Sequence, residues 1–375
     1  MIDYVEIRAA ASREIIGVVD TAKSIIWHTA YYDTGDFEIY APCTSATANL
    51  LVVGNYVTRP NDRHVGIIEH IKITFSAQDG RMIVASGRMA KSILDRRVIY
   101  RISGTSVSPT ILSGNVETAA RSVITANAIN CTFDSERNIA ALVLGAHSGS
   151  TAIIRDSSGQ ASQKQVTYDN LLTWIDDFLR EYGIGALITV NSALKLEFAC
   201  YEGVDRSVDN TGGNEPVIFS QEYDSLISSD YDYSEAEYKN MALIGGEGEG
   251  PSRFCAVYRP TQTGIDRREL FIDASSTSKT YEDDSGQEQT LTNAEYRAQL
   301  QAIAAQQLAT LQIVQTFGGE INLNGGAYEF GVDYNLGDLI TIQDNGIGLY
   351  INTRILEITE VQDDNGYNIS AVYGI

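Results

Sequence analysis

Four histidines are the residues of this chain best suited to general-base catalysis or metal binding, but they lie far apart in the sequence. His28, His64, His70 and His147 form no His-Glu-x-x-His zinc motif, and none stands at a known catalytic spacing from a cysteine. The chain also lacks the Gly-x-Ser-x-Gly turn of serine hydrolases. Carboxylates are abundant, so a glycosidase pair stays open, although no feature marks one. We therefore predict no catalytic residues, no cofactor-binding residues and no metal ligands.

Two glycine-containing stretches resemble ligand-binding loops only in part. Residues 245–250 read Gly-Gly-Glu-Gly-Glu-Gly, which lacks the Gly-Lys-Ser/Thr ending of a phosphate loop, and the two glutamates would repel phosphate. A bend or bulge where backbones approach closely is the better interpretation. Residues 363–366 read Asp-Asp-Asn-Gly, a fragment of a calcium loop without its ligand spacing or terminal glutamate. We interpret this second stretch as a hairpin turn.

The cysteines are scattered, with no close pair that would indicate a disulfide or a zinc framework. They are Cys43, Cys131, Cys200 and Cys255. We expect all of them to be buried free thiols.

The charge and the hydropathy pattern exclude several classes of partner. The chain of 375 residues has a formal net charge of −22 and a pI near 4.5, which argues against a general binder of nucleic acid or of anionic membranes. The N-terminal residues lack a basic region followed by an apolar core, and no apolar run approaches the length of a bilayer span. We expect a protein made in a cytoplasm, without its own export signal and without membrane insertion.

The strongest structural signal lies in residues 334–375. Three β-rich runs are separated by two Asn-Gly turns, Asn345-Gly346 and Asn365-Gly366, which favour tight hairpins because both residues tolerate positive φ. Three antiparallel strands with one apolar face must close or pack, so we predict a small β-barrel. Residues 54–85 repeat the same order of glycine, Ile-x-x-Ile strand, Asx-Gly turn and closing strand. This pattern indicates an internal duplication, with two unrelated meanders as the alternative.

A short helix follows the first meander and carries a basic patch. Met89, Ile93 and Arg96 fall on one face at helical spacing within residues 87–100. The basic side chains are Arg88, Lys91, Arg96 and Arg97. We interpret them as a solvated face that pairs with nearby carboxylates; the alternative is a contact with an acidic neighbouring subunit.

Three further helices are predicted in the middle of the chain. Residues 113–115 can cap a helix that carries Val116 and Val123 on its inner face. Residues 168–183 form the clearest amphipathic helix, with strands after it at 186–190 and 194–198. Thr292 and Glu295 form a capping box for the third helix, and we expect residues 317–319 to end it.

These elements predict a β-rich α+β protein with four parts. Residues 1–105 form a first β-barrel domain and residues 106–200 an α+β domain. Residues 201–250 have too few strands to close a barrel alone, so we expect them to pack with residues 318–375 as a second, split barrel. Residues 251–317 would then project as a helix-containing insertion.

Several stretches in this order resemble a family of siphophage tail-tip proteins related to the hub at the baseplate centre. The stretches are residues 32–38, 87–97, 201–207, 216–220, 238–250 and 334–338. They span nearly the whole chain, and their order and spacing carry the resemblance. Ser207 stands where the family pattern has threonine, and residues 331–333 fit the approach to the last barrel only loosely.

The resemblance implies a tail-hub-like structural protein and not an enzyme. Such hubs form a trimeric ring of two similar barrels per chain, which closes the tail tube, anchors distal tail and baseplate proteins, and lets DNA pass. The implied partners are two further copies of the chain, the distal tail protein, tail tube proteins and fibre or spike proteins. The implied location is the tail tip of a virion, after synthesis in the host cytoplasm.

Two other classes of function stay open at this stage. Some tail-tip proteins degrade peptidoglycan, but such a domain would be expected after the last barrel, and the sequence ends at Ile375. A carbohydrate-binding receptor module is the other alternative, for which the tyrosine-rich residues 223–238 are the only signal.

The duplication and the ring lead to two structural expectations. The two barrels should superpose, with Gly54 on Gly337, and the isoleucines and the closing glycines in matching places. The remaining expected matches are Ile68 with Ile355, Ile71 with Ile358, and Gly80 with Gly366. A channel for DNA should be acidic or neutral, because a basic wall would trap DNA through counterion release.

Overall fold

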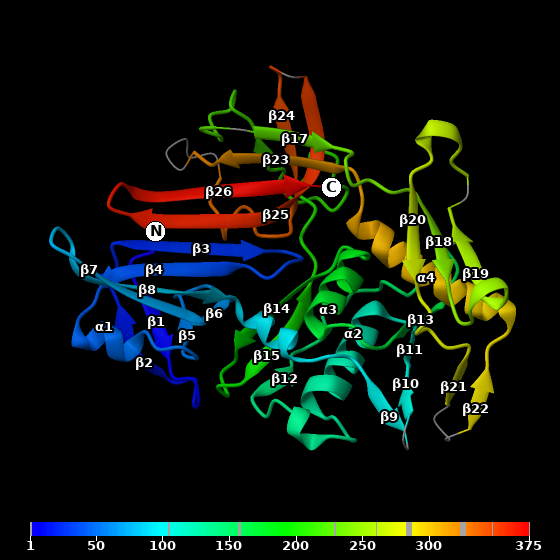
Figure 1. Ribbon diagram of the computed structural model, residues 1–375. Coiled ribbons are helices and arrows are strands. Elements are labelled where there is room, and N and C mark those ends of the chain that lie inside the picture. Colours follow the sequence, from blue (N-terminus) through cyan, green and yellow to red (C-terminus); the bar gives the residue numbers. More distant parts are fainter. Residues whose placement is uncertain are drawn as a thin grey trace.

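A large antiparallel sheet dominates the computed structural model, which describes residues 2–103, 106–156, 159–228, 230–259, 261–282, 287–322, 328–346 and 348–374. The strands along its main path are β3 (Ser24–Ala30), β4 (Asp36–Pro42), β7 (His70–Ser76), β8 (Gly80–Arg88), β17 (Asp230–Ser234), β23 (Val314–Glu320), β25 (Leu349–Asp363) and β26 (Gly366–Gly374). They lie in the order β17-β23-β26-β25-β3-β4-β8-β7 (Figure 1). The first four strands of that order come from the C-terminal part of the chain and the last four from the N-terminal part.

The N-terminal half folds as two sheets over one apolar core. The second sheet has the order β2-β1-β5-β6, and helix α1 lies beside it. The elements are β1 (Val5–Arg8), β2 (Ile15–Val19), α1 (Ser45–Leu50), β5 (Tyr56–Thr58) and β6 (Val65–Ile67). Because side chains alternate along a strand, Trp27 and Phe37 point into the core together with Ile7 and Val57.

The C-terminal half is built on the long strand β25. Its first residues pair with β24 (Leu339–Asp344), and its later residues pair with β26 on one side and β3 on the other. The short strand β16 (Ile218–Phe219) runs parallel to β24. The predicted hairpin turn at Asn365-Gly366 is confirmed, since β25 ends at Asp363 and β26 begins at Gly366.

The α+β segment forms its own core beneath the sheet. Its helices begin at asparagine caps, Asn115 for α2 (Val116–Ile124) and Asn170 for α3 (Leu171–Arg180). The predicted cap of α2 is confirmed, whereas α3 is shorter than the predicted helix at 168–183. The other elements are η1 (Ala90–Arg96), β9 (Arg101–Ser103), β10 (Ser106–Ser108), β11 (Thr110–Ser113), η2 (Thr125–Ile129), η3 (Ser135–Arg137), β12 (Leu142–Leu144), β13 (Gln163–Val166), β14 (Gly185–Val190) and β15 (Leu196–Tyr201). The predicted domain boundary at residue 105 lies outside the described residues.

The inserted segment packs helix α4 (Asn293–Thr310) on a three-stranded sheet of order β19-β18-β20. The other elements are β18 (Met241–Gly245), η4 (Gly250–Ser252), β19 (Cys255–Tyr258), η5 (Gly264–Asp266), β20 (Glu269–Asp273), β21 (Thr280–Glu282) and β22 (Glu288–Thr290). The capping box of Thr292 and Glu295 is confirmed. Two expectations need correction: α4 ends at Thr310 rather than at 317–319, which lie in β23, and β18 pairs with β19 and β20 rather than with the C-terminal strands.

Each half of the large sheet has an equivalent backbone hydrogen bond at the turn that precedes its meander. The N–H of Gly54 donates to the carbonyl of Ile68 at 2.8 Å, and the N–H of Gly337 donates to the carbonyl of Ile355 at 2.9 Å. Both glycines have positive φ, +94° and +92°, which glycine adopts without strain.

The strand registers after this turn also match. Ile71 pairs with Ala85 in the first half, and Ile358 pairs with Ala371 in the second. The halves differ beside the meander, because β1 runs antiparallel to β5 whereas β16 runs parallel to β24.

The β-rich α+β class is confirmed, and among the described residues the strands form open sheets. Closure of the N-terminal half would require β2 to pair with β3, but β3 already has β4 and β25 as neighbours. The description of each half as a closed barrel therefore stays a prediction.

Candidate functional site

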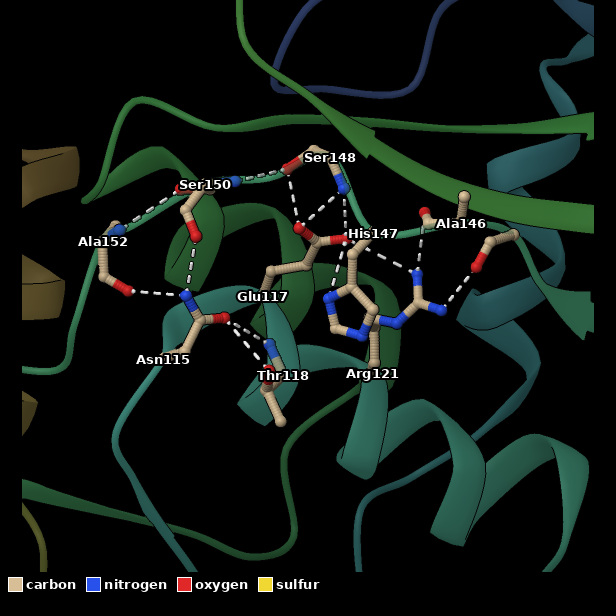
Figure 2. A network of polar contacts seen from close by, with 10 residues as sticks. Asn115, Glu117, Thr118, Arg121, Ala146, His147, Ser148, Ser150 and Ala152 are labelled. Carbon is tan, nitrogen blue, oxygen red and sulfur yellow. Dashed lines mark hydrogen bonds and ion pairs between the residues drawn. The ribbon is translucent and has the colours of Figure 1, made fainter.

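A buried carboxylate in helix α2 gathers a serine and a histidine, which invites a catalytic interpretation (Figure 2). Glu117 is 1% exposed and accepts hydrogen bonds from the backbone N–H and the Oγ of Ser148, at 3.0 and 2.6 Å. His147 Nδ1 lies 3.7 Å from the same carboxylate and Arg121 Nη1 lies 3.5 Å from it. A nucleophilic triad needs the histidine between serine and acid, whereas here both side chains face the acid. The arrangement anchors the loop at 145–152 to α2 and contains no activated nucleophile.

A pocket of about 800 Å³ lies where the N-terminal half meets the C-terminal half and the segment after β15. Arg59 Nη2 contacts Asp62 and Glu360 at 2.5 Å each, and Tyr367 donates its hydroxyl to Glu360 at 2.6 Å. Burial raises the pKa of Asp62, but hydrogen bonds and charge from His64 and Arg59 outweigh it and hold that pKa well below its usual range. Because Glu360 is buried and paired, this network ties the β5–β6 loop to β25.

The pocket does not assemble a recognisable catalytic set. His64 Nδ1 lies 2.8 Å from Asp62, but the residues that line the pocket in the described part of the chain include neither serine nor cysteine. No group of three potential metal ligands occurs among the described residues.

A second ion pair joins residues 201–207 to the C-terminal half. Arg206 Nε lies 3.0 Å from Asp338 Oδ2, and Asp338 Oδ1 accepts the N–H of Val204 at 2.7 Å. Leu339 also bridges to Asp205. The segment that follows β15 is therefore held against β24 by a buried carboxylate.

The seam between β25 and β3 joins the two halves of the large sheet. Seven consecutive residue pairs run from Glu357 opposite Ala30 to Asp363 opposite Ser24. His28 Nε2 lies 3.3 Å from Glu357, and this hydrogen bond is the largest cause of the raised pKa of His28. Ile358 is buried at the same seam. The two halves are thus one continuous structure.

The outer strands of the large sheet are exposed and carry apolar side chains. Among the described residues β7 pairs only with β8, and β17 pairs only with β23. The exposed fractions are 51% for Ile73, 75% for Phe75, 42% for Tyr231 and 50% for Tyr233. Edge strands of this kind present unpaired backbone groups and are templates for pairing with another chain. These two edges form the candidate interaction site. Strand β17 lies within the tyrosine-rich residues 223–238, which were the only signal for a carbohydrate-binding module, and no sequence signal identified β7.

The face of the large sheet that points away from the cores is acidic. Residues directly opposite each other across paired strands share a face, and Trp27 and Phe37 define the core side. The charged side chains described on the other face are Asp36, Glu38, Lys72, Arg88, Asp230, Asp232, Arg354, Glu357 and Asp363. Acidic groups therefore outnumber basic groups on this face by six to three.

The basic patch and the cysteines fall into structural roles, with one correction. Arg88 pairs with Glu69 and Asp95, as the interpretation of a charge-paired face predicted, but Lys91 is buried against Asp176 at 2.8 Å. Cys255 is exposed on β19, so the prediction that all four thiols are buried is wrong. No helix among the described residues combines the length and apolarity needed to cross a bilayer.

Comparisons with known proteins place the chain among phage tail proteins. A family model described as Siphovirus ReqiPepy6 Gp37-like protein matches residues 4–375. No curated protein matches the sequence. The structure is similar to the 43 kDa tail protein of prophage MuSo2 from Shewanella oneidensis, with 13% identity, a TM-score of 0.55, and 99% of this chain and 98% of that chain covered. It is also similar to the tail protein from Neisseria meningitidis MC58, with 13% identity, a TM-score of 0.56, and 99% and 96% covered. At a sequence identity of 13%, these similarities show that this chain has the same fold as the two tail proteins.

Proposed function

The chain belongs to the Siphovirus ReqiPepy6 Gp37-like protein family, and we propose that it is a structural hub at the tip of a phage or phage-like tail. In this role copies of the chain form a ring that closes the tail tube, anchors distal tail and baseplate proteins, and lets DNA pass through its centre. The proposal places the protein in the virion and assigns it no enzymatic activity.

The observation that carries the proposal is the order of strands in the large sheet. The C-terminal half reads β17-β23-β26-β25 and the N-terminal half reads β3-β4-β8-β7. With the matched registers of the two meanders, β7 corresponds to β25, β8 to β26, β4 to β23 and β3 to β17. The chain is therefore a tandem of two equivalent sheet halves, which supports an internal duplication.

The two halves join head to tail, which supports a ring. In the order of the sheet, the last strand of the C-terminal half, β25, pairs with the first strand of the N-terminal half, β3. The two strands left at the outer edges are β17, which is the first strand of its half, and β7, which is the last strand of its half. Contacts of this heterologous kind repeat from copy to copy and close if the rotation allows. Three copies would supply six equivalent halves, which matches a sixfold tail tube without a symmetry clash.

The domain division forms part of the proposal. The ring wall would consist of two barrel-like units, residues 1–105 and residues 201–250 with 318–375. The strand Met241–Gly245 is excepted, because it pairs with strands of the insertion at 251–317. Residues 106–200 and the insertion would lie outside the wall, where distal tail, tube, fibre or spike proteins could dock. Figure 1 shows both segments on the side of the molecule below and beside the large sheet.

The acidic face of the large sheet supports passage of DNA. In a ring whose wall is this sheet, the face away from the cores would line the channel. Duplex DNA releases counterions when it binds cationic surfaces, so a channel wall with six carboxylates against three basic groups per chain would not retain it.

Light scattering on the purified full-length chain tests the proposal. We expect a concentration-independent mass of three chains, because permanent interfaces bury more than about 1,000 Å² each. A stable monomer at all concentrations would contradict the ring. The two alternative classes are tested on the same sample: clearing of peptidoglycan in a gel would favour a cell-wall-degrading enzyme, and a glycan-array signal would favour a receptor module.

A further inference from the structure

We propose that strand β7 of one copy pairs antiparallel with strand β17 of the next copy, in the register of the internal seam between β25 and β3. This inference rests on the proposed ring and specifies which strands and which residues join its copies. It assigns the exposed edges to a second copy of the chain rather than to a fibre, a peptide or a glycan.

The register follows from the strand pairs of the two halves. Ile71 opposite Ala85 corresponds to Ile358 opposite Ala371, which places Ile73 of β7 at the position of Glu360 of β25. Phe37 pairs with Gly87 and with Trp27 in the first half.

In the second half, Phe317 pairs with Tyr373 and with Tyr231, so Tyr231 stands at the position of Trp27. Because Glu360 pairs with Trp27 inside the chain, Ile73 is expected opposite Tyr231 of the next copy.

The remaining pairs follow by counting along both strands. They are His70 with Ser234, Ile71 with Tyr233, Lys72 with Asp232, and Thr74 with Asp230. Each pair joins a residue of one copy to a residue of its neighbour.

The charges on the two edges are complementary in this register. Lys72 is one of three basic groups on the acidic face, and the register puts it directly opposite Asp232. His70 of β7 would lie diagonal to Asp232 of β17. The internal seam has the same kind of contact between His28 and Glu357, but there the histidine is on β3 and the acid is on β25. Opposite charges in facing positions stabilise paired strands. A slip of one residue would move Lys72 to the other face relative to Asp232 and lose the pair.

The apolar side chains of the two edges are complementary as well. Ile73 and Tyr231 face each other on the core side of the sheet in this register, and in the single chain both are about half exposed. At the internal seam the equivalent positions, Glu360 and Trp27, are buried. Pairing of the edges would bury both side chains and would also satisfy the backbone groups that each edge strand leaves free.

Disulfide crosslinking tests the register directly. In a Cys255→Ser background, Ile73→Cys combined with Tyr231→Cys places two thiols opposite each other, within the Cα separation that a disulfide needs. We expect oxidation to yield chains covalently linked as trimers on a non-reducing gel. The matched control combines Ile73→Cys with Asp232→Cys, whose side chains point to opposite faces of the sheet, and should stay unlinked.

Charge reversal supplies a second readout that needs no oxidation. Lys72→Asp alone and Asp232→Lys alone should each weaken assembly about tenfold, because like charges then face each other, and the double exchange should restore it. If the unmodified chain assembles into trimers but neither crosslinking nor rescue occurs, the pairing is wrong while the ring stands. If the unmodified chain is a monomer, the ring itself fails. A fibre protein or glycan found on β7 or β17 of the assembled particle would also overturn the pairing.

Discussion

At the scale of single residues, Asp338 holds the segment after β15 against the C-terminal half. It is buried and accepts hydrogen bonds from the backbone of Val204 and Asn335 as well as from Arg206. A buried carboxylate of this kind serves several donors at once, so its removal leaves more than one group unpaired.

Replacement of Asp338 by alanine should therefore destabilise the fold strongly. Breaking a buried pair from one side costs about 3–5 kcal/mol of unfolding free energy. The control is Glu269→Ala, which removes an exposed ion pair with Arg267 and should change stability by less than about 1 kcal/mol. Urea unfolding of both variants measures the difference, and equal effects would contradict the role given to Asp338.

His28 predicts a pH dependence of the internal seam. The hydrogen bond to Glu357 raises the pKa of His28 above its ordinary value of 6.5, so the folded chain binds this proton more tightly than the unfolded chain does. The stabilisation from protonated His28 is present in full below the pKa that this histidine has in the unfolded chain. It is lost as the pH rises through the pKa of His28 in the folded chain. Urea midpoints of the natural chain and of His28→Gln should differ more at about pH 5.5 than at about pH 8.5. A difference independent of pH would contradict this account.

At the scale of elements, the two glycine turns before β5 and β24 form a matched pair. Both have positive φ, so alanine strains the backbone at either position by about 1 kcal/mol. They differ in space: a Cβ on Gly337 would lie 2.2 Å from the ring of Tyr31, whereas a Cβ on Gly54 would meet only Ala10 at 3.7 Å.

We therefore expect Gly337→Ala to cost at least about 2 kcal/mol more than Gly54→Ala. Thermal unfolding of the two variants under the same conditions measures this. Equal melting temperatures would show that Tyr31 moves freely, which its burial and its hydrogen bond to the carbonyl of Gly183 argue against.

Local signals predicted many elements but not how they assemble. The capping box at Thr292 and the Asn-Gly turn at residue 365 depend on neighbours in the sequence, so they were predictable. The end of α4 was misplaced, because the spacing of Val314 and Phe317 fits both a helical face and a strand. Only pairing with β17 and β26, which are distant in the sequence, decides for a strand. The interaction site was identified only in part, since the tyrosine-rich residues 223–238 contain β17 but nothing indicated β7. An edge is defined by strands that do not pair, and no residue type records that.

At the scale of the whole molecule, the acidic face predicts how the assembled protein treats DNA. The natural chain should not retain duplex DNA at about 50 mM salt, whereas Glu38→Lys with Asp230→Lys should bind it, with affinity falling steeply towards about 200 mM. The control, Glu215→Lys with Glu288→Lys, makes the same change in net charge at exposed positions off the large sheet and should stay unable to bind. Mobility-shift titrations measure all three proteins. Equal binding by the two variants would show that net charge decides and not the face of the sheet.

The most direct test of the central claim is an electron cryo-microscopy map of the purified full-length chain. We predict a threefold ring with an open centre, in which each copy contributes both sheet halves to a wall that continues from chain to chain through β7 and β17. A monomer with free edges would contradict the account, as would a closed dimer that buries the acidic face.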